Sequence, residues 1–191
     1  MTARPAWVAL GLTLLAPPRP AAAQDAFVPS LAAGVEAGAA VFPEKVDWKS
    51  AVGIGVGGSL GCTFAGSAGS LTTDLGVHYA RWEASLEGAG SSTIGALSIL
   101  PGIRWMWAGV LASPWLGVRA GVVFTSYDNA TWGETRFAVR PGLGVRLSLF
   151  RMVDLGPYVE IEVAPGALHG ASDTRYTLAW PEFGLEASLR R

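Results

Sequence analysis

Two residues able to do acid–base chemistry stand four positions apart, Asp74 and His78. A carboxylate that orients an imidazole makes the ring a general base, which hydrolases use to activate a nucleophile. The chain has no serine or cysteine at a recognisable spacing from this pair to serve as the nucleophile. We therefore predict that Asp74 and His78 form a buried, hydrogen-bonded pair without a catalytic role, because buried polar groups are nearly always hydrogen-bonded.

Other candidate ligands are too few or lack the context that their chemistry needs. His169 has Asp173 nearby, but one histidine and one carboxylate are too few for a specific metal site, and both are expected in a solvated loop. The glycines of residues 53–58 resemble a dinucleotide-binding loop, but that motif needs a helix after it, and the residues that follow continue a strand pattern. We expect these glycines to leave room for long arginines. The sequence thus predicts no catalytic residue, no cofactor and no metal.

Strands must position all of these residues, because the dominant period of hydrophobicity is two. Between Arg136 and Phe150 the apolar residues share one parity and the arginines share the other, and on a strand the two parities point to opposite faces. Cys62, the single cysteine, has the apolar parity and is expected to be an inert thiol that forms no disulfide within the chain. Eight such segments are predicted as strands: Leu31 to Phe42, Trp48 to Phe64, Leu71 to Trp82, Thr93 to Trp107, Trp115 to Thr125, Arg136 to Phe150, Pro157 to Ala167 and Tyr176 to Leu189.

The connections between these segments alternate in length. Short ones follow the second, fourth and sixth segments: Ala65 to Ser70, Ala108 to Ser113, and Arg151 to Asp154. Mostly longer and more polar ones follow the others: Pro43 to Asp47, Glu83 to Ser92, Ser126 to Glu134, and His169 to Arg175. Short turns at one end and longer loops at the other are typical of an up-and-down barrel that crosses the outer membrane.

Charged residues collect on one parity, and their signs nearly cancel. Balanced charges are also common on a solvated outer surface, so a soluble barrel with these charges outside is an alternative. The opposite parity carries almost no charge, as a face in contact with lipid requires, so we place the charges inside the barrel, where they would pair. The predicted lumen charge network is Glu36, Asp74, His78, Arg104, Arg119, Arg136, Arg140, Arg146, Glu160, Glu162, Glu182 and Glu186.

Aromatic residues and prolines add two further expectations. Tryptophan and tyrosine favour membrane interfaces. We expect one aromatic girdle near the loops, with Trp48, Tyr79, Trp82, Tyr127, Trp132 and Tyr176, and one near the turns, with Phe64, Trp105, Trp107, Trp115 and Phe150. Proline removes a donor from a strand ladder, so bulges or strand ends are expected at Pro101, Pro114, Pro141, Pro157, Pro165 and Pro181.

The first 23 residues have the layout of a cleaved signal peptide: a basic residue at Arg4, an apolar stretch from Ala6 to Ala16, and small residues before Gln24. We expect one barrel domain over residues 24–191. No later segment reaches the 18 uninterrupted apolar residues of a spanning helix. The formal net charge of -1 gives no reason to expect nucleic acid as a partner. The 25 glycines disfavour long helices.

With these features, the chain resembles the small outer-membrane β-barrel domain family, of the OmpX and OmpA transmembrane type. The resemblance rests on the signal peptide, the eight alternating segments, and elements such as residues 100–104 (LPGIR) and 140–146 (RPGLGVR). The last segment, residues 182–189, looks like the family's assembly signal but is followed by Arg190 and Arg191 where a terminal aromatic is usual. The resemblance implies outer-membrane lipid and the barrel-insertion machinery as partners.

The sequence therefore predicts an all-β protein, an eight-stranded antiparallel up-and-down transmembrane barrel with a packed polar lumen. We expect it in the cell outer membrane, with a structural or surface-interaction role through its extracellular loops, toward an unknown surface ligand, and not as an enzyme. Three alternatives stay open: a narrow pore or carrier, a lipid-modifying outer-membrane enzyme, and a soluble periplasmic barrel.

Overall fold

The computed structural model describes residues 28–42, 51–86, 90–127, 133–149, 153–169 and 175–189. The predicted signal peptide, the histidine–aspartate pair of the last loop, Trp48, Trp132 and Phe150 lie outside the described residues or side chains. Within the described ranges, the structure contains no helix with the length and hydropathy of a membrane-spanning helix.

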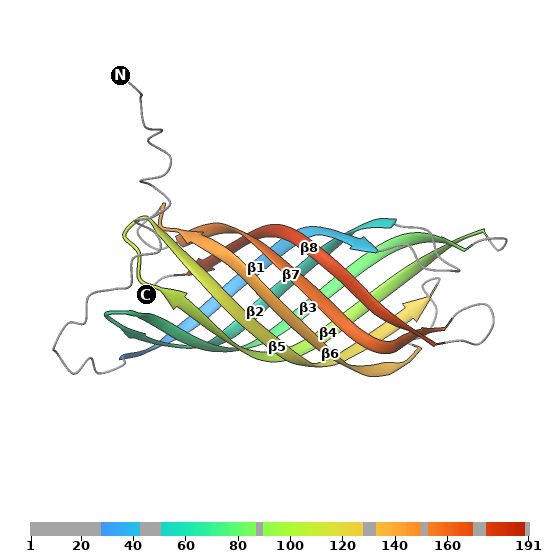
Figure 1. Ribbon diagram of the computed structural model, residues 1–191, viewed down its shortest axis with the longest axis horizontal. Helices are drawn as coiled ribbons and strands as arrows, with labels where there is room; N and C mark the ends of the chain where they lie inside the picture. Colours follow the sequence, from blue (N-terminus) through green and yellow to red (C-terminus); the bar gives the residue numbers. More distant parts are fainter. Residues whose placement is uncertain are drawn as a thin grey trace, which may run out of the picture.

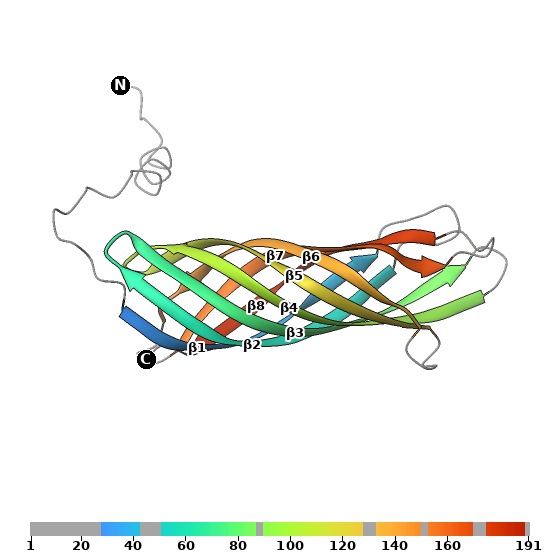
Figure 2. The same ribbon diagram turned by 90° about the horizontal axis from the view of Figure 1, so that it is seen from below.

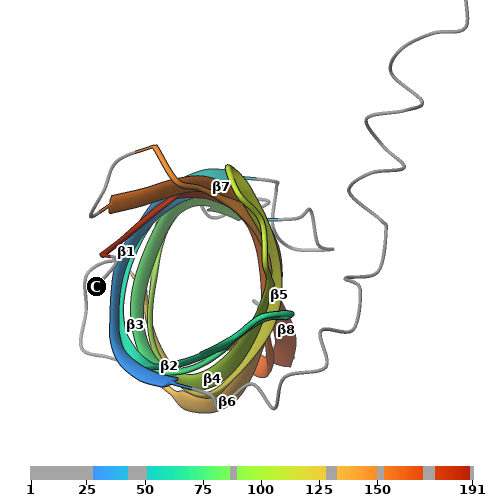
Figure 3. The ribbon, with the colours of Figure 1, turned by 90° about the vertical axis from the view of Figure 1, so that its left-hand side faces the viewer.

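Eight antiparallel strands form a closed barrel in which each strand pairs with its neighbours in the sequence and β1 pairs with β8 (Figure 1). The end-on view shows the strands as a complete ring (Figure 3). This confirms the predicted fold class and the number of strands. The strands are β1 (Val28–Phe42), β2 (Ala51–Gly66), β3 (Gly69–Leu86), β4 (Gly90–Trp107), β5 (Ala112–Tyr127), β6 (Thr135–Leu147), β7 (Val153–His169) and β8 (Arg175–Leu189).

The two ends of the barrel differ. At one end, called the turn end here, residues 67–68 join β2 to β3 and residues 108–111 join β4 to β5. The start of β1 and the end of β8 also lie there (Figures 1 and 2). The opposite end, called the loop end, holds the connections between β1 and β2, β3 and β4, β5 and β6, and β7 and β8.

The predicted loop from Glu83 to Ser92 was wrong, because most of it belongs to strands. The β3–β4 ladder continues through the pairs Glu83–Thr93 and Ala84–Ser92 as far as Leu86–Gly90. Polar side chains do not end a strand when the backbone hydrogen bonds of the ladder can continue, as they do here. The hairpin therefore extends farther at the loop end than its hydrophobic pattern indicated.

The outward-facing prolines fit into the strands with little disturbance. At Pro101 the β4–β5 ladder runs from the Ile99–Val122 pair to the Gly102–Arg119 pair without a change of register. Only Pro165, among the six prolines named above, adjoins a register shift, which lies between Ala164 and Leu168 where Gly166 has a φ of 63°. A positive φ suits glycine and permits the bulge. The expected bulge is thus confirmed at Pro165. The expectation was wrong for prolines such as Pro101, which lie within a strand that keeps its register.

The two faces of the barrel differ as the alternation predicted. Large apolar side chains are exposed on the outside, among them Ile54, Leu60, Leu75, Val77, Ile103, Leu116, Phe137, Leu143, Ile161, Phe183 and Leu185. Charged side chains are buried on the inside, among them Arg104, Arg119, Arg140, Glu160, Glu162, Glu182 and Glu186.

This pattern reverses at the loop end. Here the outside carries polar exposed residues, namely Arg81, Glu83, Thr135 and Thr177. The inside carries a cluster of buried apolar residues: Ala80, Trp82, Ile94, Ala96, Leu100, Val123, Ala138, Ala164, Leu178 and Trp180. We call this cluster the apolar plug. The barrel thus has apolar residues outside and charges inside along most of its length, and the opposite arrangement near the loops.

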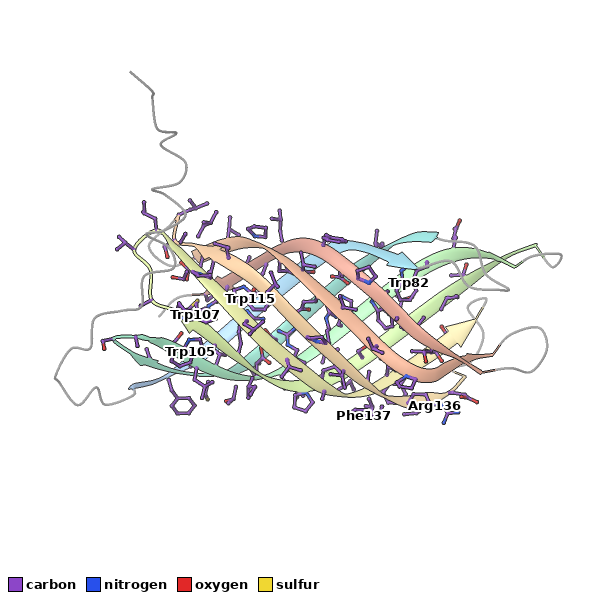
Figure 4. The ribbon with its side chains drawn as sticks, viewed as in Figure 1. Trp82, Trp105, Trp107, Trp115, Arg136 and Phe137 are labelled. Carbon is purple, nitrogen blue, oxygen red and sulfur yellow. The ribbon has the colours of Figure 1, made fainter. Side chains whose placement is uncertain are left out.

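Two predicted girdle residues point inward instead. Trp82 belongs to the apolar plug, and Trp115 is buried in the lumen. Each has the parity of the lumen residues on its own strand, Trp82 with His78 on β3 and Trp115 with Arg119 on β5. Figure 4 shows Trp105, Trp107 and Trp115 toward the turn end and Trp82 and Phe137 toward the loop end.

Candidate functional site

A cluster of buried ion pairs fills the middle of the lumen, and Arg140 of β6 lies at its centre. The Arg140 guanidinium donates from Nε to Glu160, from Nη1 to Glu162 over 3.4 Å, and lies 3.6 Å from Glu182 through Nη2. Only 1% of the Arg140 side chain is exposed. One cation therefore bridges carboxylates of β7 and β8, the two strands that follow β6.

A second arginine extends the cluster toward β3. Arg119 of β5 holds Asp74 through two donors, Nε to Oδ1 at 3.3 Å and Nη2 to Oδ2 at 3.1 Å. Its Nη1 lies 3.6 Å from Oε1 of Glu160, which also accepts from Arg140. Paired charges of this kind are tolerated in a confined interior because each desolvated group has an opposite charge beside it.

The predicted pair of Asp74 and His78 is absent, because the two side chains have other partners. Nε2 of His78 lies 2.9 Å from Oε2 of Glu182, whereas Asp74 is held by Arg119. Positions four apart on a strand are separated by about 13 Å, so two such side chains cannot share a hydrogen bond. The partner of His78 is Glu182 of β8, which is distant in the sequence.

A smaller group lies nearer the turn end. Glu186 of β8 accepts from Arg104 of β4 and, over 3.0 Å, from Nη2 of Arg146 of β6. The Arg104 guanidinium carbon also lies 4.1 Å from the centre of the Trp115 ring. A guanidinium over an indole face is a favourable cation–π contact, so Trp115 stabilises a lumen charge and is not an interface residue.

One member of the predicted network lies apart from these groups, and the side chain of a second is not among those described. Arg136 pairs with Glu134 at the loop end, where about a third of its side chain is exposed, and its Nε donates to the carbonyl of Gly166 over 3.1 Å. The register pairs Glu36 with Gly57 of β2 and Glu186 of β8, and its side chain lies outside the described ones. The structure therefore brings ten of the twelve predicted residues into the lumen groups.

Sequence reasoning missed two buried hydroxyl donors. Tyr158 donates to Glu182, and Ser98 donates to Glu162. Both residues have the parity of the charged residues on their strands, so the alternation contained the signal for their inward orientation. Their partners could not be read from it, because they come from other strands.

Glycine creates the space that the ion pairs occupy. A Cβ atom on Gly55 of β2 would overlap the Glu182 carboxylate and lie 2.9 Å from Nε2 of His78. A Cβ on Gly144 would lie 2.7 Å from Nε1 of Trp115, which covers this glycine from the neighbouring strand. Gly55 thus accommodates Glu182 and His78, so at this position the expectation that an arginine fills the space was wrong.

The apolar plug lies inside the barrel on the loop-end side of the ion pairs. Trp82 and Trp180 meet edge to face, with ring centres 4.9 Å apart and planes at 74°. Ile94 and Leu178 are fully buried beside them in the same cluster. Among the ion pairs, the cavity next to Arg119, Arg140 and Trp115 has a volume of about 10 Å³. A cavity of that size holds about one water molecule, so there is little free space beside these three residues.

The geometry of the cluster opposes hydrolytic chemistry. Ser98 lies opposite His78 in the β3–β4 ladder, so a hydroxyl, an imidazole and carboxylates are neighbours. Ser98 donates its proton to Glu162, however, while His78 Nε2 is directed at Glu182. Both residues are almost completely buried. The hydroxyl is therefore neither activated by the imidazole nor reachable by a substrate. Among the described residues, no group of three or more histidine, cysteine, aspartate or glutamate side chains could hold a metal ion.

Comparison with known proteins decides the kind of barrel. No family model and no curated protein sequence matches the chain. Among solved structures, neisserial surface protein A matches with a TM-score of 0.62 and 14% identity, over 86% of this chain and 99% of that one. The chain has the fold of the small outer-membrane β-barrel proteins. The expected family of folds is thereby confirmed.

Two other solved structures match less closely. The outer membrane enzyme PagL has a TM-score of 0.49 and 18% identity, over 82% of this chain and 99% of that one. Ail, the attachment invasion locus protein of Yersinia pestis, has a TM-score of 0.46 and 9% identity, over 83% and 99%. The likeness to neisserial surface protein A, at 14% identity, establishes the fold alone.

Proposed function

We propose that this outer-membrane barrel has a structural or surface-interaction role and neither conducts solutes nor catalyses a reaction. The observation that carries the proposal is the filled lumen, in which the charged cluster is capped by the apolar plug. A water-filled pathway would need free volume along the axis, and side chains take up that volume in narrow eight-stranded barrels. Partners on the cell surface would then be met by the connections at the loop end.

The outer face supports residence in a membrane. Its exposed side chains in mid-barrel are apolar, for example Leu143 and Leu185, and exposing so many to water would be unfavourable. A charge at the midplane of such a face costs about 2 to 4 kcal/mol, which accounts for its restriction to uncharged residues. The proposal includes export by a signal peptide over residues 1–23, a barrel domain over residues 24–191, and insertion by the outer-membrane assembly machinery.

Conductance tests the closed lumen. We expect purified barrel in planar bilayers to show no unit conductance steps, at concentrations where a wide porin, used as the positive control, shows them. The variant Trp82→Ala/Trp180→Ala removes the largest plug residues but leaves the Arg140 cluster in place, so it should also stay closed. Reproducible conductance steps from the wild-type barrel would establish a pore and overturn this part of the proposal.

Accessibility tests the surface role. A protease site inserted between β5 and β6, in residues 128–132, should be cut on intact cells, whereas the same site in residues 151–152, between β6 and β7, should be cut only after the outer membrane is opened. The reverse pattern would show that the loop end faces the periplasm. Lipid composition of vesicles incubated with the barrel should stay unchanged, and conversion that is lost in Ser98→Ala would instead identify an enzyme.

A further inference from the structure

The turn end carries a group of exposed apolar side chains that the lumen and the outer face do not account for. Val110 is 91% exposed and Leu111 is 74% exposed, both in the turn between β4 and β5. Leu149, just after β6, is 60% exposed, and Trp107 at the end of β4 is also exposed. We call these four residues the turn-end rim. Exposed apolar groups of this kind mark a contact surface.

Backbone hydrogen bonds hold the rim in place. The amide of Ala108 donates to the carbonyl of Ala68 in the β2–β3 turn over 3.3 Å. The amide of Ser148 donates to the carbonyl of Leu111 over 3.1 Å, which links the β4–β5 turn to the end of β6. The rim is therefore a built surface that joins neighbouring turns, and its apolar side chains are held outward.

The chemistry of the rim fits lipid. Within the described turn residues, 67–68, 108–111 and 148–149, no side chain is charged. The rim also continues directly into the apolar outer face, since Trp107 follows Trp105 and Ile103 on β4. A contact surface that is continuous with the lipid-facing band through Trp105 and Ile103 has lipid as its natural occupant.

The height of the band gives a second reason. On β3 the outward run is uncharged and ends where Arg81 and Glu83 follow; its residues are Leu71, Thr73, Leu75, Val77 and Tyr79. The eight steps from Leu71 to Tyr79 span about 26 Å along the strand. At the usual strand tilt that is about 20 Å of barrel height, less than the apolar band of about 25 Å that outer-membrane barrels show. Because Arg81 and Glu83 limit the band on this strand at the loop end, further apolar height next to β3 can only be added at the turn end.

We propose that the turn-end rim enters the membrane and lies at the boundary between headgroups and acyl chains of the periplasmic leaflet. This inference rests on the proposed membrane residence and adds its depth: the β4–β5 turn is seated in lipid instead of projecting into the periplasm. Because the strands are longer than the membrane is thick, the loop end, with its apolar plug, then protrudes from the other leaflet.

Fluorescent labels at single cysteines test the seating. In a Cys62→Ala background, Val110→Cys, Leu143→Cys and Thr177→Cys would each carry an environment-sensitive dye, with the barrel reconstituted in phosphatidylethanolamine and phosphatidylglycerol vesicles. Leu143 marks the middle of the apolar face, and Thr177 marks the polar loop end. We expect a blue-shifted emission at positions 110 and 143, and quenching of both dyes by lipids brominated on the acyl chain. The dye at position 177 should emit as in water.

The outcomes separate this inference from the proposed function. A water-like, unquenched dye at position 110 with a quenched dye at position 143 would overturn the seating and leave the membrane barrel intact. Water-like emission at both positions would overturn both. A blue shift at position 110 without quenching by brominated lipid would mean that protein covers the rim, such as a second copy of this chain, and would also overturn the lipid assignment.

Discussion

A single long side chain in the lumen can pair with charges on more than one strand. Arg140 lies near carboxylates on two strands, so its removal would leave several buried negative charges without their main partner. Breaking a buried ion pair on one side is costly for this reason, although replacing both partners by apolar groups can be neutral. We therefore expect the stability of the barrel to fall when one partner of a lumen ion pair is replaced, and to change less when both partners are replaced by apolar residues.

Arg140→Met should destabilise the barrel by about 3 to 5 kcal/mol, because it removes the nearest cation from the buried carboxylates of Glu160 and Glu162. Urea unfolding in phospholipid vesicles, followed by tryptophan fluorescence, measures the change. The matched control is Arg136→Met on the same face of the same strand. Its partner Glu134 is partly exposed, so the loss should stay within about 1 kcal/mol. Equal losses for the two variants would show that the Arg140 cluster contributes no more than an exposed pair.

Gly55→Ala should destabilise the barrel by about 1 to 3 kcal/mol, because the added methyl group overlaps the Glu182 carboxylate. The same unfolding measurement applies. In the double variant Gly55→Ala/Glu182→Asp the shorter side chain should recover part of the loss. If the alanine variant unfolds like the wild type, the space beside Gly55 is not limiting.

The limits of sequence reasoning are clearest at this scale. Parity along each strand indicated the inward orientation of residues such as Arg119 and Glu182. It could not give partners, because Arg104 and Glu186 are separated by 82 positions and meet only when the barrel closes. The predicted pair of Asp74 and His78 failed because sequence proximity was taken for spatial proximity on an extended strand.

At the scale of the strands, length and face composition set the position of the barrel in its membrane. The strands contain 13 to 18 residues, more than the 9 to 11 that crossing requires. The excess coincides with the reversal of faces at the loop end, where Arg81 and Thr177 are outside and Trp82 and Trp180 are inside. That section is built like a water-soluble barrel, with an apolar core and a polar surface.

Leu185→Arg and Thr177→Arg, both on the outer face of β8, should differ in effect. At Leu185, in the middle of the apolar face, arginine should cost about 2 to 4 kcal/mol of stability in vesicles. At Thr177, in the water-exposed section, the change should be close to zero. A comparison of unfolding free energies decides, and an equal cost at both sites would place Thr177 in lipid too.

Strand existence was predictable from the sequence, and strand ends were not. Alternation identified all eight strands, because each has one apolar face over most of its length. The same rule ended the third strand too early, since the residues beyond Trp82 lack that pattern while their backbone still pairs. Trp82 was assigned to an interface from its residue type, although its parity with His78 indicated the lumen.

At the scale of the whole molecule, closure joins every strand to two neighbours, so no strand edge is left open. The sequence predicted this architecture because eight segments with one apolar face cannot be satisfied in lipid by an open sheet. It could not predict the surface ligand, since the connections that would bind it carry no recognisable motif.

The closed barrel should resist denaturation by detergent at room temperature. Unheated protein in sodium dodecyl sulfate is expected to migrate as a compact band and to shift after boiling, and it should sediment with the outer membrane. Recovery in the soluble periplasmic fraction, with no shift on heating, would instead support the soluble barrel.

The pairing of β1 with β8 also sets how the molecule would respond to mechanical force. Because the start of β1 and the end of β8 lie together, pulling them apart would open their eight pairs in succession, like a zipper, from Ala33–Leu189 to Ala40–Glu182. Such unzipping needs little force, since one pair bears the load at a time. Yet Glu182 and Glu186 anchor β8 to β3, β4 and β6 across the lumen. The force at which the barrel yields is therefore set by its internal charges and not by its backbone seam.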